Sequence, residues 1–469
     1  MKFDNSGNGA ARRKSPMEND TGVERNLRAE LRSKAEDIFL HVLTTLTSWE
    51  RAVNNTTVTG PFTPGTIDER KWSHLSLANG FPGVSLLFTE CAASDRSFKT
   101  IAHDYFGQAR RHMTAQDLMH NGLFHGVGAF AFSVNAAQRA FGGYRSALES
   151  LDVVMRKGMD RVLSSAGHGV CSSFQLYDAI SGLSGVGRYF LHRPTGENVG
   201  PLQAALRYCV SLADFVEEDG AVLPKWWVRH QPNAYTPKPR ARNGHGNFGL
   251  AHGIAGPLAL LSESYSAGIT VDGQADAMRH FAAALQDWRV QDEYGFYWPP
   301  YTSFTIYTER HSGPVDPRTV GHRGRPSWCY GAPGVSHALM RAGQVLGERS
   351  YCDTAVESIK SMLAVPYGEM GIADASICHG WAGLLHVLRR FERIANIDFS
   401  DEVDHIASLV MDEFDPTHAF GFQFAVMDKT LRVNSPGFLD GAAGVALALK
   451  SYASDDLPAS SWDSALLVS

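Results

Sequence analysis

Cysteine is scarce in this chain of 469 residues, and its spacing is irregular. The six cysteines are Cys91, Cys171, Cys209, Cys329, Cys352 and Cys378. The N-terminal segment MKFDNSGNGAARRKSPMENDTG is polar and lacks the apolar core of a secretory signal. A disulfide framework is therefore not expected. We expect reduced thiols and a cytoplasmic protein, with residues 1–24 as a disordered N-terminal tail.

Long apolar runs and an excess of basic charge are also lacking. No run of about 18 apolar residues occurs, so we expect no membrane span. The net charge of −6 argues against a general nucleic-acid-binding protein, because such proteins need a basic face for the phosphates. We therefore expect no nucleic-acid partner.

A glycine-rich turn recurs along the chain, in which two glycines three residues apart lead into an apolar run. Six clear copies are NGFPGVSLLF at 79–88, SGLSGVGRYFL at 181–191, HGIAGPLALL at 252–261, YGAPGVSHALM at 330–340, HGWAGLLHVL at 379–388 and DGAAGVALAL at 440–449. A weaker seventh copy, FHGVGAFAF at 124–132, has His125 in place of the first glycine. The intervals between copies are long enough for two helices with their loops.

The periodicity between these turns predicts an all-α protein. Segments such as QADAMRHFAAALQDWRV have helical periodicity with a charged face, whereas the runs after the glycines are almost entirely apolar. We predict seven helical hairpins, each with an outer amphipathic helix, a glycine turn and an inner apolar helix. We expect them to close into an (α/α)7 toroid over residues 25–455, followed by a C-terminal tail at 456–469. An open solenoid would need polar capping repeats, and none is evident.

Two segments interrupt the helical pattern, before the fourth and fifth turns. Residues 215–247 and 293–326 are rich in proline and aromatic residues, which predicts long loops with short strands. Within residues 221–250 there is no acidic residue but five basic ones: Lys225, Arg229, Lys238, Arg240 and Arg242. A solvated loop and a binding surface for a peptide leader or another acidic partner explain them equally well.

The glycine turns also align potential metal ligands. In a closed ring, the two residues before each first glycine lie around one end of the centre. The fifth and sixth turns, which are neighbours, contribute Cys329, Cys378 and His379 at these positions. Two thiolates and an imidazole form a common zinc-binding set, and three protein ligands leave one coordination position open, as in catalytic sites. We therefore predict one zinc ion per chain.

Other polar residues accompany these ligands. His252 occupies the position of His379 one turn earlier than Cys329, so we expect it to act as a general acid or base. Asp178 lies four residues before Gly182 and could equally cap the inner helix. Asp440 occupies the same position as His252 in the seventh turn, where a supporting or capping role is expected.

The sequence resembles the lanthionine synthetase C-like family. The matching motifs are LYDAISGLSGVG at 176–187, GNFGLAHGIAGPLALL at 246–261, SWCYGAPG at 327–334 and ICHGWAG at 377–383. The resemblance implies zinc held by Cys329, Cys378 and His379, acid/base work by His252, and Asp178 and Arg325 near the reacting groups.

The resemblance also implies a reaction. Cyclases of this family add cysteine thiols of a precursor peptide to dehydroalanine or dehydrobutyrine in the same peptide. Zinc binds the thiol, and addition gives an enolate that must be protonated. The dehydrated precursor peptide is the expected substrate. A dehydratase and a peptide exporter are further expected partners, and they would hold the enzyme near the membrane.

Two other functions compete with this interpretation. Helical toroids also occur among glycoside hydrolases, but these need two carboxylates across a cleft, whereas the turns here supply thiols and imidazoles. A relative that binds glutathione or another small thiol, without cyclising peptides, would keep the same zinc ligands. That alternative stays open at the level of sequence.

Overall fold

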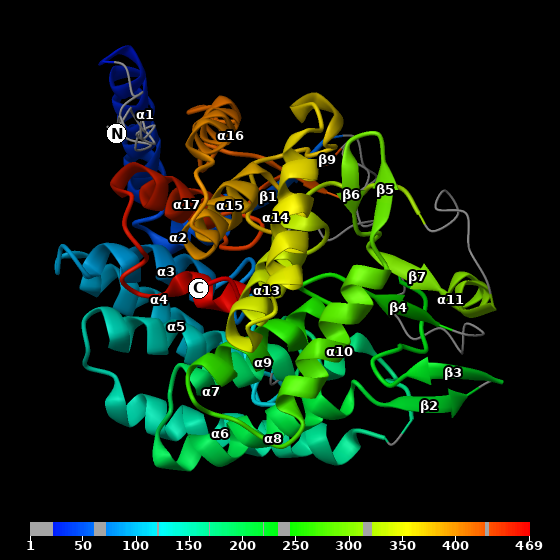
Figure 1. Cartoon of the computed structure of the whole chain (residues 1–469). Coiled ribbons are helices and arrows are strands. Elements are labelled where there is room, and N and C mark those ends of the chain that lie inside the picture. The colour runs from blue at the N-terminus through cyan, green and yellow to red at the C-terminus, as the bar shows by residue number, and fades with distance from the viewer. Residues whose placement is uncertain are drawn as a thin grey trace, which may run out of the picture.

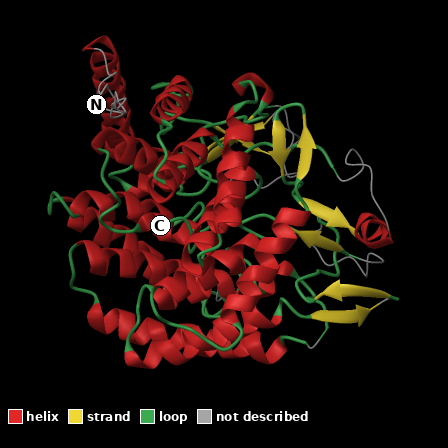
Figure 2. Ribbon diagram, in the orientation of Figure 1, coloured by secondary structure: helices red, strands yellow, loops and turns green. Residues whose placement is uncertain are grey.

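The structure is a computed structural model that describes residues 22–60, 72–119, 122–167, 169–218, 220–232, 244–312, 321–426 and 431–469. Helices dominate it, and short strands gather toward one side of the helical body (Figure 2). The inner helices are α3 (Phe81–Ala92), α5 (Gly126–Ala140), α7 (Leu183–Leu191), α9 (Ala255–Ser266), α13 (Ala332–Leu346), α15 (Trp381–Ala395) and α17 (Ala442–Ser454). Each follows one glycine turn, as predicted.

The outer helices are amphipathic and surround the inner ones (Figure 1). They are α1 (Gly22–Thr45), α4 (Phe98–His112), α6 (Arg145–Ser165), α8 (Gly196–Ser211), α10 (Gln274–Asp287), α14 (Arg349–Leu363) and α16 (Ser400–Asp412). Every residue of α3 is buried, whereas α4 buries only five of its residues, on one face. Of the outer helices, the one that each inner helix contacts most is the one that follows it, not the preceding one as predicted, and α1 packs on α17. The two ends of the chain thus complete one hairpin.

Backbone hydrogen bonds between the glycine turns close the ring. Each turn bonds to the next through the residues that precede its glycine. The bonds run from Leu77 N to Phe124 O, Phe124 N to Ile180 O, Ala179 N to Ala251 O, Ala251 N to Cys329 O, Cys329 N to Cys378 O, Cys378 N to Leu439 O, and Leu439 N to Ala78 O. The last bond returns to the first turn. The predicted (α/α)7 toroid is therefore confirmed.

Crowding at these turns explains the glycine pairs. A Cβ added to Gly383 would lie 1.9 Å from the carbonyl oxygen of Ile377, and one added to Gly444 would lie 1.8 Å from that of Phe438. No side chain fits there, as the sequence led us to expect. Positive φ is the reason only at Gly331 (φ 87°) among the first glycines of the six clear turns.

The C-terminal segment fills the middle of the ring, although the sequence suggested a tail outside the domain. The 3-10 helix η4 (Trp462–Leu466) is wholly buried and contacts α5 and α7. The indole Nε1 of Trp328 donates a hydrogen bond of 2.7 Å to the carbonyl oxygen of Leu466. The reason is that a closed ring of helices leaves a hollow centre, which apolar side chains of this segment occupy. Most of the predicted N-terminal tail, residues 1–21, lies outside the described residues.

The two predicted loops carry strands, as expected. They contain β2 (Phe215–Glu218), β3 (Ala221–Pro224), β4 (His245–Asn247), β6 (Gly295–Tyr297) and β7 (Tyr301–Ser303). Strand β5 (Val290–Asp292) lies just before the second predicted loop, and the antiparallel pairs are β2–β3, β4–β7 and β5–β6. A further sheet joins β1 (Thr57–Thr59), β9 (Leu431–Asn434) and β8 (Phe424–Val426). The remaining short helices are α2 (Trp49–Asn54), α11 (Phe304–Ser312), η2 (Phe174–Leu176) and η3 (Tyr367–Glu369).

In the described part of the chain, no helix is both long and apolar enough to cross a bilayer.

Candidate metal centre and catalytic site

Cys329, Cys378 and His379 lie together on the rim formed by the glycine turns. Their ligand atoms all fall within 4.8 Å of one another, and no other such group of three exists among the described residues. The hydrogen bond from Cys329 N to Cys378 O holds the two turns side by side. Ligands of a tetrahedral zinc ion are roughly 3.5–3.8 Å apart, given bond lengths of about 2.0–2.3 Å. The donor set and its spacing therefore fit zinc after a small contraction.

The electrostatics of this cluster favour ionisation of one thiol. A hydrogen bond from Cys378, followed by one from His379, lowers the pKa of Cys329 well below its usual value despite burial. Burial opposes protonation of His379, but the hydrogen bond to Cys329 and the charge of Asp440 raise its pKa overall. Nδ1 of His379 is 3.9 Å from Oδ1 of Asp440, an oxygen that makes no hydrogen bond among the described residues. Asp440 therefore lies where it can orient the imidazole ligand.

The four cysteines outside the cluster differ from Cys329, the thiol whose pKa is lowered. Burial raises the pKa of Cys91 and of Cys209 to about 12 and that of Cys171 to about 11, and it also raises the pKa of Cys352. All four remain protonated thiols at neutral pH, which agrees with a structural role.

His252 and Asp178 form a hydrogen-bonded pair on the same rim. Nδ1 of His252 donates to Oδ2 of Asp178 at 2.7 Å, and the aspartate side chain is completely buried. The other carboxylate oxygen accepts hydrogen bonds of 2.7 Å from the backbone N–H groups of Ser181 and Gly182. Asp178 therefore caps the turn before α7, as the sequence allowed, and the same carboxylate also orients the imidazole of His252.

The pair sets the charge of the imidazole. Burial alone would lower the pKa of His252, but the hydrogen bond and the charge of Asp178, with the charge of Cys329, raise it overall. The side chain of His252 stays 22% exposed, so it can reach a substrate. Ala251, its neighbour, donates its backbone N–H to the carbonyl oxygen of Cys329, which places the His252–Asp178 pair beside the cluster of candidate metal ligands.

Arg325 is exposed at the edge of the same rim. The pKa values of Cys378, His379 and Asp440 are all raised overall, and the positive charge of Arg325 opposes each rise, so Arg325 lies within electrostatic reach of the cluster. The structure thus brings together all six residues singled out from the sequence.

Two aromatic residues complete the site and were not predicted. Tyr330 follows Cys329, accepts a hydrogen bond of 3.1 Å at its hydroxyl from Asn247, and has its ring 6.3 Å from that of His252. Phe174 packs against His252 with ring centroids 4.6 Å apart. Tyr330 occupies the same position before the glycine as His252 and His379, and this could have identified it. No signal in the sequence marks Phe174.

Known proteins are similar to this chain in sequence and in architecture. The model of the family described as lanthionine synthetase C-like protein matches residues 71–467. The chain belongs to the lanthionine synthetase C-like family. This family member is 22% identical over 390 residues to the nisin biosynthesis protein NisC of Lactococcus lactis subsp. lactis, covering 81% of this chain and 86% of that protein. Its fold matches the solved structure of nisin cyclase with a TM-score of 0.69 at 20% identity, over 84% of this chain and 92% of that one.

The basic residues of the loop 221–250 divide into two groups. Lys225 pairs with Asp214 at 2.9 Å, and Arg229 pairs with Glu218 at 2.7 Å. Lys238, Arg240 and Arg242 lie outside the described residues. In the described part of the loop, the positive charges of Lys225 and Arg229 are therefore paired with carboxylates of the same chain.

Proposed function

We propose that this protein is a zinc-dependent lanthionine cyclase, which adds cysteine thiols of a dehydrated precursor peptide to its dehydroalanine or dehydrobutyrine residues. The observation that carries the proposal is the position of the Cys329, Cys378 and His379 cluster beside the His252–Asp178 pair on one rim. Family membership supports the same chemistry. Zinc bound there would supply a Lewis acid that ionises the substrate thiol at neutral pH.

The reaction balances without an external reagent. A C–S bond forms at the β-carbon, the π bond of the alkene breaks, and the thiol proton is lost. The electron pair moves onto the substrate carbonyl as an enolate, whose α-carbon must then gain a proton. His252 is the proposed donor, since Asp178 raises its pKa and so favours the imidazolium near neutral pH. Arg325 is the proposed source of positive charge for the enolate oxygen.

Two consequences follow for partners and location. Serine and threonine must lose water before a thiol can add, so a dehydratase has to act earlier on the same peptide. We expect the reaction in the cytoplasm, where thiols remain reduced. A peptide exporter that holds the enzyme near the membrane remains an expectation.

The decisive experiment supplies the zinc-loaded protein with a synthetic peptide that contains one cysteine and one dehydroalanine. Ring closure leaves the mass unchanged but removes the thiol, so alkylation followed by mass spectrometry should show loss of the alkylated species. A parallel reaction with glutathione and a cysteine-free dehydrated peptide tests the small-thiol alternative. Glutathione adducts without peptide rings would favour that alternative.

A further inference from the structure

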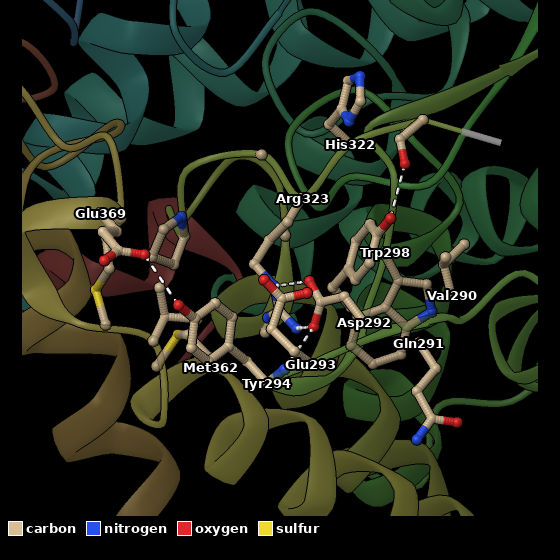
Figure 3. A pocket seen from close by; sticks show the side chains of 18 residues that line it. Val290, Gln291, Asp292, Glu293, Tyr294, Trp298, His322, Arg323, Met362 and Glu369 are labelled. Atoms are coloured by element: carbon tan, nitrogen blue, oxygen red, sulfur yellow. Dashed lines mark hydrogen bonds and ion pairs between the residues drawn. The ribbon is translucent and has the colours of Figure 1, made fainter. Parts of the chain in front are cut away.

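A cavity of about 600 Å³ lies next to the metal-binding turn (Figure 3). Its walls come from the β5–β6 hairpin, the segment 321–326, the start of α13, the end of α14 and residues up to Met370. This volume is typical of sites that hold small ligands or a few side chains. Neither the metal ligands nor the His252–Asp178 pair line it.

The cavity is nevertheless close to the reacting groups. Pro326 and Gly331 form part of its wall, and they flank the segment that carries Cys329. Gly331 is two residues from Cys329, so their Cα atoms are at most about 7–8 Å apart. Arg325 precedes Pro326, and a Cβ built on Gly371 would lie 4.0 Å from the Cβ of Arg325. An extended peptide advances about 3.3–3.6 Å per residue, so two or three residues would connect the metal centre to the cavity.

The inner wall of the cavity is apolar, and its polar side-chain atoms already have hydrogen-bond partners within the protein. Tyr297, Trp298, Met362, Val365 and Met370 are all buried there. The indole N–H of Trp298 donates to the carbonyl oxygen of Leu285 at 2.6 Å, and the hydroxyl of Tyr297 donates to that of Gly321 at 2.7 Å. These polar atoms need no partner from a ligand, so the wall offers an apolar side chain a place without loss of hydrogen bonds.

The outer edge of the cavity carries uncompensated negative charge. Arg323 pairs with Asp292 through bonds of 2.6 and 2.8 Å, as Figure 3 shows, so those two charges cancel. Glu369 accepts a hydrogen bond of 3.0 Å from the hydroxyl of Tyr294. Glu293 and Glu369 are exposed, and neither pairs with a basic side chain in the part of the chain that the structure describes. The cavity therefore combines an apolar floor with two carboxylates, Glu293 and Glu369, that lack a basic partner among the described residues.

We propose that this cavity binds the part of the substrate peptide that lies two or three residues from the reacting cysteine, and that it selects an apolar side chain beside a lysine or arginine. The proposal rests on the proposed function and deepens it by naming what the enzyme reads around each cysteine. The carboxylates attract the cation while the aromatic wall covers the apolar neighbour. Glutathione carries net negative charge and is disfavoured at this edge.

The test uses tetrapeptides with acetylated N-termini and amidated C-termini. The first pair is Ile-Lys-Gly-Cys and Ile-Glu-Gly-Cys, and the second pair has the reversed order, with cysteine first. Affinity for the zinc-loaded protein is measured by calorimetry with the wild type, with the double variant Glu293→Gln/Glu369→Gln, and with the control Glu36→Gln/Glu149→Gln. The control removes the same charge from the exposed surfaces of α1 and α6. Zinc content and melting temperature verify that each variant is intact.

In at least one order, the lysine peptide should bind the wild type more tightly than the glutamate peptide does. The double variant should weaken binding of the lysine peptide by roughly two- to thirtyfold, since exposed ion pairs contribute about 0.2–1 kcal/mol each and two carboxylates are neutralised. The glutamate peptide should bind the double variant no more weakly, and the control should change neither affinity. Equal affinities for both peptides, or equal losses in both, would overturn the inference.

The same variants separate this inference from the proposed function. If the wild type binds with the expected charge preference but closes no ring in a dehydrated peptide, the cavity is supported as a peptide-binding site and the cyclase function is refuted. If the double variant closes rings in lysine-containing peptides with an unchanged kcat/KM, the proposed role of the cavity is refuted and the cyclase function is supported.

Discussion

Replacing Asp178 by asparagine tests whether this carboxylate controls proton transfer. Asparagine is isosteric, so its oxygen can keep the two hydrogen bonds from the backbone N–H groups of Ser181 and Gly182. What disappears is the negative charge 2.7 Å from Nδ1 of His252. The asparagine NH₂ group would instead face that nitrogen as a donor, which forces the ring into the opposite tautomer.

The expected loss follows from the strength of a charge-assisted hydrogen bond. Such a bond contributes about 1.5–3 kcal/mol. Since each 1.4 kcal/mol corresponds to about a factor of ten, we expect kcat for ring closure to fall by roughly 10- to 100-fold. The pKa of His252 should also fall, because burial lowers it and the raising effect of Asp178 is gone. If protonated His252 is the donor, activity is lost as pH rises through its pKa, so the alkaline limb should move to lower pH.

The assay is ring closure of a dehydrated peptide, followed by thiol alkylation and mass spectrometry across a pH series. Asp178→Ala separates catalysis from folding, because it also removes the two bonds to the turn and should lower stability. Asp404→Asn is the matched control, since that carboxylate pairs with Arg28 and Tyr452 away from the rim. Wild-type kcat with an unshifted pH profile in Asp178→Asn would leave Asp178 as a turn cap alone. A loss of stability in Asp178→Asn as large as that in Asp178→Ala would also indicate that Asp178 acts only as a turn cap.

Four further outcomes are expected. Elemental analysis should find about one zinc per chain, and Cys378→Ala should lose most of it; full retention would refute the ligand assignment. His252→Ala should keep zinc but lose most cyclisation, and unchanged ring formation would remove it from the mechanism. Enzymatic ring closure should persist well below pH 8.5 and flatten near neutrality, whereas the uncatalysed rate should rise about tenfold per pH unit below the thiol pKa; parallel curves would show that the thiol is not activated. Asp463→Ala should lower the free energy of unfolding in urea by about 3–5 kcal/mol, because it leaves the largely buried Arg390 without its counter-charge and the buried His386 without a hydrogen-bond partner, each 3.0 Å from that carboxylate; a change below about 1 kcal/mol would contradict this.

The sequence was sufficient to predict the ring because its cause is local. A first glycine is required where the turn folds back on its own backbone, since a Cβ built on Gly380 would lie 2.2 Å from the backbone nitrogen of Ser376 in the same turn. That requirement repeats in the sequence and so can be counted. The clustering of Cys329, Cys378 and His379 was predictable for the same reason, since the two cysteines occupy equivalent positions in adjacent turns.

Features that depend on long-range packing were not predictable. Nothing in the composition of residues 456–469 indicates that they fill a ring, because that requires knowledge of the hollow they enter. The bond between His252 and Asp178 joins residues 74 positions apart, and the register of the turns predicted only that His252 would face the rim. The acidic cavity beside Arg325 likewise needs a hairpin and a helix that only the fold brings together.

The rim combines ring closure and metal binding in the same residues. Cys329 and Cys378 share one of the backbone hydrogen bonds that close the ring, and their thiols supply two ligands of the proposed zinc. From inside the ring, the bond between Trp328 and the carbonyl oxygen of Leu466 fixes the residue immediately before Cys329. The positions of the two thiols are thus fixed by backbone hydrogen bonds and by packing inside the ring, which is the rigid support that a catalytic metal site requires. The exposed Arg325 and the adjoining cavity, by contrast, lie at the edge where we propose that the substrate peptide binds.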